Sequence, residues 1–69
     1  MKISARNALK GTIVAVKKGA VMAQVVVDVG GGNRVHSAIF VDSVRDLTLK
    51  KGDQVFVVVK STDVMIAKP

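Results

Sequence analysis

Alternation of side chains with a period of two is the feature that most constrains the fold of this chain. A period of two places successive side chains on opposite faces of a strand, and valine, isoleucine and threonine, which dominate these runs, favour strands. The pattern predicts strands over residues 7–17, 21–29, 34–41 and 55–59, and a short fifth strand over 64–67. The residues expected to share one face of the second strand are Val21, Ala23, Val25, Val27 and Val29.

The segments between these runs predict turns and one short helix. Gly30-Gly31-Gly32-Asn33 is typical of a hairpin turn, because glycine and asparagine tolerate positive φ. Residues 42–47 break the alternation, and Asp42 or Ser43 could cap a helix of one or two turns there. We therefore expect an all-β protein, a five-stranded OB-like barrel with a short helix between the third and fourth strands.

The length of the chain predicts association between copies. With 69 residues it forms one domain, 1–69, and a domain of this size buries only about 60% of its unfolded surface. Small domains usually need disulfides, a metal or oligomerisation, and this sequence has no cysteine and one histidine. Since 49% of the residues are hydrophobic, we expect a homo-oligomer that buries the surplus apolar surface.

The charge balance predicts an anionic ligand. The net charge is +6, which attracts nucleic acid, anionic lipid or a small oxyanion without choosing among them. The first residues include Lys2, Arg6 and Lys10 and do not resemble a signal peptide. The apolar run at 21–29 is shorter than the roughly 20 residues that span a bilayer. We expect a cytoplasmic protein that does not interact with membranes.

The sequence offers little for catalysis. His36 lies within a predicted strand with no acid or nucleophile nearby, and the aspartates fall at turns or at the helix start. The glycine run lacks the Lys-Ser/Thr that follows in a phosphate-binding loop. We expect no enzymatic activity, no catalytic residues and no metal held by protein side chains.

A basic OB-like barrel could also bind nucleic acid. Such barrels combine a basic groove with aromatic platforms on which bases stack. Here Phe40 and Phe56 are the only aromatic residues apart from His36, and many lysines fall in turns, as in Lys17-Lys18 and Lys50-Lys51. Nucleic-acid binding therefore stays as the alternative, together with a purely structural oligomerisation module.

Two polar segments contain the donors that a small dianion needs. Ser4-Ala5-Arg6-Asn7 precedes the first predicted strand, and Lys60-Ser61 follows the fourth. Arginine, lysine, serine and backbone N–H groups all donate hydrogen bonds to oxyanions. An ordinary polar terminus and an ordinary polar turn would have the same composition.

At these residues the sequence resembles the Mop family of molybdate-binding proteins, the molbindins. The resemblance covers essentially the whole chain and is most specific in I-S-A-R-N and K-S-T-D-V-M-I. The matching pieces are Met1–Asn7, Gly11–Val14, Val21–Ala23, Asp42–Val44, Leu47–Asp53 and Val59–Ile66.

The resemblance implies a hexamer, a trimer of dimers, that holds molybdate or tungstate at subunit interfaces for storage or buffering. It implies no organic cofactor, and molybdenum is bound only as its oxyanion. Ser43, at the predicted helix start, is a weaker candidate for the same site. The oxyanion ligands that the resemblance implies are Ser4, Ala5, Arg6, Asn7, Lys60 and Ser61.

Overall fold

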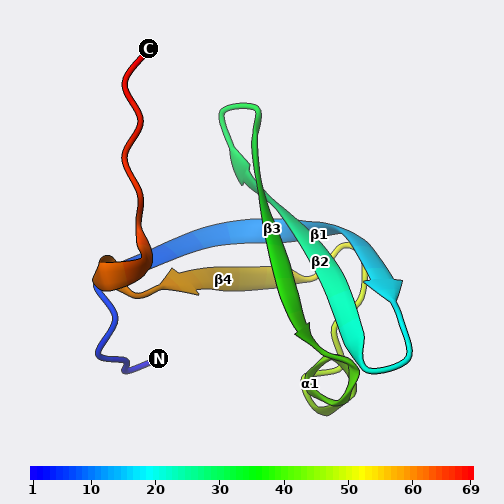
Figure 1. Cartoon of the computed structure of the whole chain (residues 1–69). Helices are drawn as coiled ribbons and strands as arrows, with labels where there is room; N and C mark the ends of the chain where they lie inside the picture. The colour runs from blue at the N-terminus through cyan, green and yellow to red at the C-terminus, as the bar shows by residue number, and fades with distance from the viewer.

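A computed structural model describes all 69 residues and shows one antiparallel sheet with one short helix (Figure 1). The strand order in the sheet is β3-β2-β1-β4. No helix is long and apolar enough to cross a membrane. The elements are β1 (Asn7–Lys18), β2 (Met22–Gly30), β3 (Asn33–Phe40), α1 (Val41–Asp46), β4 (Gln54–Val59) and the 3-10 helix η1 (Ser61–Asp63).

Strand β1 connects two halves of the sheet. Its first part pairs with β4, from Asn7 opposite Val59 to Thr12 opposite Gln54, and its second part pairs with β2. A bulge between Ile13 and Ala15 marks the change of partner, and bulges bend and twist a strand. The β2–β3 hairpin consequently crosses the β1–β4 pair at a steep angle (Figure 1).

The core lies between these two halves. Ala23, Val25 and Val27 are buried, so the face expected for the second strand is confirmed over these three residues. Ile13 from β1 and Val44 from α1 complete the buried cluster, and Val55 and Val57 of β4 pack against it. The helix therefore closes one end of the core.

Helix α1 begins earlier than expected. Its N-cap is Phe40, with no side-chain hydrogen bond, so the expected capping by Asp42 or Ser43 is wrong. Asp42 lies inside the first turn and instead pairs with Arg45 at 3.3 Å. The apolar spacing that ties the helix to the core, through Val44, outweighs the capping preference of Asp and Ser.

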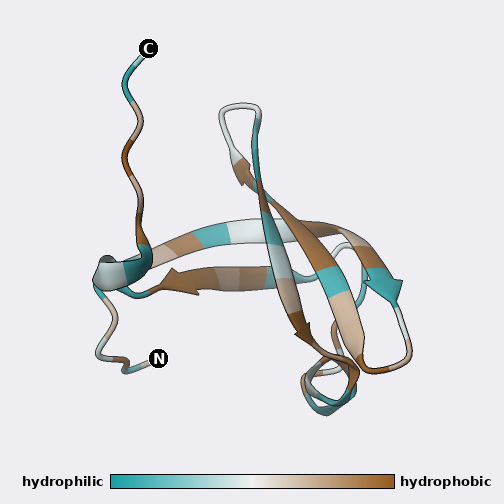
Figure 2. Cartoon of the chain, viewed as in Figure 1, coloured by the Kyte–Doolittle hydropathy of each residue, from teal (hydrophilic) through white to brown (hydrophobic).

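The structure has four strands, and the expected fifth strand over 64–67 does not form within the single chain. Residues 64–69 extend away from the sheet (Figure 1), although Figure 2 shows them to be largely apolar. Met65 and Ile66 are 93% and 89% exposed. A strand needs a hydrogen-bonding neighbour, and this segment reaches no free edge of its own sheet.

Candidate anion site

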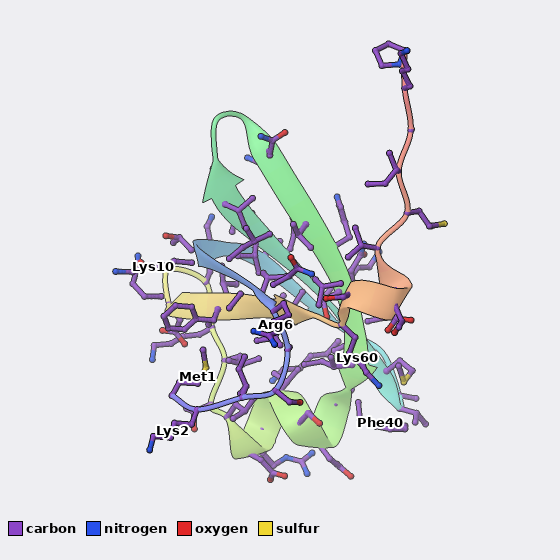
Figure 3. All side chains as sticks on the ribbon, turned by 90° about the vertical axis from the view of Figure 1, so that its left-hand side faces the viewer. Met1, Lys2, Arg6, Lys10, Phe40 and Lys60 are labelled. Carbon is purple, nitrogen blue, oxygen red and sulfur yellow. The ribbon has the colours of Figure 1, made fainter.

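The register between β1 and β4 brings the two polar segments to one end of the molecule. Asn7 opposite Val59 is the last pair of this ladder, so Arg6 and Lys60 stand immediately beyond it. Both side chains lie at this end in Figure 3. Ser61 follows as the first residue of η1. Strand pairing thus brings Arg6 and Lys60 to the same end of the molecule, although they are far apart in the sequence.

The segments are open to solvent in the single chain. Ser4, Arg6, Asn7, Lys60 and Ser61 are exposed, and Ala5 is half-buried. None of these residues lines either of the two main hollows of the surface. One chain therefore supplies donors at a surface and does not enclose a ligand.

The charges of Arg6 and Lys60 are not neutralised by the protein. The two salt bridges join Arg45 to Asp42 and Lys50 to Asp53, so neither involves Arg6 or Lys60. Backbone N–H groups are also free, because residues 4–6 make none of the backbone hydrogen bonds outside the helices and strands. Free cations beside free N–H groups suit an anion.

Asn7 differs from the other residues of its segment. Its side-chain Nδ2 donates to the Val59 carbonyl oxygen at 3.3 Å, so the amide is already used within the protein. This bond could not be predicted from the sequence, because its partner is 52 positions away and a backbone carbonyl has no residue-type signature.

Ser43 does not join the other candidates within one chain. It is half-buried in α1, which packs against β2 and β3. Its carbonyl accepts the N–H of Leu47 at 3.0 Å, and it lies two residues inside the helix. A contribution from Ser43 to the site would have to come from another copy of the chain.

An open groove of about 540 Å³ lies over the core. It is lined mainly by apolar side chains of β2, β4 and the segment after α1, together with Met1. A dianion needs donors, which this groove largely lacks, so the groove suits apolar polypeptide better than an oxyanion.

His36 has an ordinary role in the structure. It is exposed on β3, and its Nδ1 lies 3.2 Å from Nε2 of Gln24 on the neighbouring strand. No group of three or more His, Cys, Asp or Glu residues is arranged to hold a metal ion.

Four antiparallel strands, one short helix and a cationic, donor-rich strand end define a small all-β protein with a candidate oxyanion site. The chain belongs to the TOBE domain family, which matches residues 3–66. Relatives of similar sequence are named molybdenum-pterin-binding, or Mop, proteins. The recognition of the Mop family from the sequence is thereby confirmed.

The similarity to these relatives extends over the whole chain. Molybdenum-pterin-binding protein 3 of Clostridium pasteurianum is 58% identical over 96% of this chain and 97% of its own length. Molybdenum-pterin-binding protein 2 of the same organism is 56% identical over the same shares.

Solved structures agree in fold. An apo structure of MopII from Clostridium pasteurianum has a TM-score of 0.91 and 54% identity, covering 97% of this chain and all of that one. A molybdate-binding protein from Sporomusa ovata has a TM-score of 0.92 and 46% identity, covering 99% and 100%. The cytoplasmic molybdate-binding protein ModG, with molybdate bound, has a TM-score of 0.83 and 48% identity, covering 88% of this chain and 43% of that one.

Proposed function

We propose that this protein binds molybdate, and also tungstate, for intracellular storage or buffering. The observation that carries this proposal is the β1–β4 register, which puts Arg6 and Lys60 just beyond the same end of the ladder, with neither of them in a salt bridge. Relatives of closely similar sequence and fold are molybdate-binding proteins by name.

The proposed ligands are all hydrogen-bond donors. Arg6 and Lys60 supply charge, Ser4 and Ser61 supply hydroxyls, and Ala5 with Asn7 supplies backbone N–H groups. Neither segment contains a carboxylate, so the site favours an ion that is fully ionised at neutral pH. Phosphate, which is partly protonated, would lack an acceptor for its proton. Sulfate would bind more weakly because it is smaller. Its sulfur–oxygen bonds are shorter than the metal–oxygen bonds of molybdate and tungstate, so its oxygens would not reach all the donors.

The number of donors is sufficient for useful affinity. A hydrogen bond to a charged group contributes roughly 1.5–3 kcal/mol net. Four to six such bonds, less the costs of association, reach micromolar affinity, which corresponds to about 8 kcal/mol. No covalent step and no organic cofactor are required, so the protein acts as a binding protein and not as an enzyme.

The site is completed by assembly into a homo-oligomer, a hexamer built as a trimer of dimers. The single chain leaves both the donor segments and the tail 64–67 exposed, and it carries an apolar groove beside a free edge of β4. The tail of a neighbouring copy would supply the fifth strand of each barrel and bury Met65 and Ile66. Ser43 of a neighbouring copy could then reach the site.

The inorganic oxyanion is proposed as ligand in preference to a pterin conjugate or a nucleic acid. Both of those ligands have flat rings that need stacking partners. The chain has no tyrosine or tryptophan, and its phenylalanines lie on β3 and β4 rather than in either donor segment. We further propose that residues 1–69 form one domain and that the protein is cytoplasmic.

Calorimetric titration with molybdate, tungstate and sulfate tests the proposal. We expect the first two to bind and sulfate to bind at least tenfold more weakly. Arg6→Ala should abolish most of the affinity, because it removes a charge and a forked donor. Arg34→Ala, which removes an exposed arginine of β3, is the matched control and should bind as the parent does. Equal affinities for Arg6→Ala and the parent would show that the site lies elsewhere.

A further inference from the structure

Only one side-chain hydrogen bond ties the two donor segments together. The Nδ2 of Asn7 donates to the carbonyl oxygen of Val59 at 3.3 Å. Asn7 follows Arg6 directly, and Val59 precedes Lys60 directly. The bond therefore joins the two residues that are next in the chain to the cationic residues Arg6 and Lys60.

The segment that begins at Lys60 makes no hydrogen bond to the rest of the chain. Strand β4 is at the edge of the sheet and pairs only with β1, in a ladder that ends at Val59. The next backbone bonds are local, from the N–H of Asp63 to Lys60 at 2.9 Å and from that of Val64 to Ser61 at 3.5 Å. Residues 60–69 are all exposed. Within the single chain, Lys60 and Ser61 are therefore held to the sheet only through Val59.

We propose that the side chain of Asn7 is a positioning residue for the oxyanion site and not one of its ligand donors. This inference rests on the proposed function. The amide fastens the end of β4 to the start of β1, which keeps Lys60 and Ser61 beside Arg6. A site held in place before the ligand arrives loses less conformational entropy on binding.

A second bond in the same pair of strands provides an internal comparison. The Nε2 of Gln54 donates to Oγ1 of Thr12 at 2.8 Å, at the opposite end of the β1–β4 ladder. It also clips β1 to β4, but five residue pairs away from the donor segments. A general effect of strand stability would make the two bonds equivalent for ligand binding, whereas positioning makes only the Asn7 bond important.

The experiment compares Asn7→Leu, which is nearly isosteric and cannot donate, with Thr12→Val, which removes the acceptor of the other bond. Molybdate affinity is measured by calorimetry, and stability by urea unfolding. We expect Asn7→Leu to weaken molybdate binding by about two- to tenfold, the equivalent of one hydrogen bond. Thr12→Val should lower the stability by about as much as Asn7→Leu does, but it should leave the molybdate affinity within twofold of that of the parent. Asn7→Gln, which keeps the donor, should recover most of the affinity.

A measurement without ligand separates positioning from direct contact. The {1H}-15N heteronuclear NOE of residues 60–63 should fall in ligand-free Asn7→Leu and stay unchanged in Thr12→Val, because only the first loosens this segment. A donor that touched molybdate directly would leave these values unchanged. In a Lys60→Ala background, Asn7→Leu should then have little further effect on affinity, since coupled residues are not additive.

The outcomes are distinct. Unchanged heteronuclear NOE values for residues 60–63 in Asn7→Leu, or equal losses of affinity in Asn7→Leu and Thr12→Val, would overturn the assignment of Asn7. A parent protein that binds no molybdate would overturn the proposed function. The relaxation data would still decide whether Asn7 holds the segment.

Discussion

Gly11 lies against Asp28 so closely that a Cβ atom at position 11 would stand 2.6 Å from the Asp28 carbonyl oxygen. The same atom would stand 2.6 Å from Cγ1 of Val27, which is buried in the core. Gly11 is itself buried, at the point where β1 passes from β4 to β2. The absence of a side chain at this position is what allows the two halves of the sheet to approach.

Gly11→Ala should therefore destabilise the protein. Backbone oxygen cannot move aside as a flexible side chain could, so we expect a loss of about 1–3 kcal/mol, the usual cost of overpacking. Urea unfolding at fixed protein concentration measures it. Gly19→Ala, whose Cβ would stand 2.9 Å from the Met22 carbonyl oxygen in an exposed turn, should cost less. Equal stability of Gly11→Ala and the parent would mean that the sheet relaxes freely there.

Thr48→Gly should stabilise the protein. The N–H of Leu49 donates to Val44 and that of Thr48 to Arg45, which is a Schellman ending for α1 with Thr48 at φ 52°. A β-branched residue is strained in this left-handed region, and we expect a gain of about 0.5–1 kcal/mol after the entropic cost of glycine. Thr62→Gly, at a position without positive φ, serves as the control and should give no gain in the unfolding midpoint.

Met65→Asp should weaken assembly. Met65 is 93% exposed in the single chain, so a charge there costs little before association. It would cost several kcal/mol if the tail enters an apolar groove, because an unpaired carboxylate would lose its water. Light scattering should show smaller particles for Met65→Asp and unchanged ones for Lys68→Asp, a charge change at the polar end of the tail. Identical masses for Met65→Asp and the parent would argue against burial of the tail.

Molybdate should raise the thermal stability of the protein. A ligand that binds only the folded state adds about 2.7 kcal/mol at a concentration of 100 Kd. Differential scanning calorimetry should show an increase in Tm with molybdate for the parent and for Arg34→Ala. Lys60→Ala should show a much smaller increase, because the site would lose one of its two cations. A shift of the same size in Lys60→Ala would exclude that lysine from the site.

The sequence by itself determined four of the strands and the face that the second strand buries. Alternation is a local property, so Ala23, Val25 and Val27 could be assigned to the core before any partner was known. The hairpin turn at Gly30-Gly31-Gly32 was equally local, because all three glycines adopt positive φ. The two donor segments were also recognisable, from residue types and from the family resemblance.

Only the tertiary structure decided how those segments meet. Pairing of Asn7 with Val59 sets Arg6 beside Lys60, and the side chain of Asn7 is used in that pairing. The tertiary structure also decided that the helix begins at Val41 and that residues 64–67 have no strand partner within the chain. Strand register and free edges depend on contacts between residues far apart in the chain, and no local pattern encodes them.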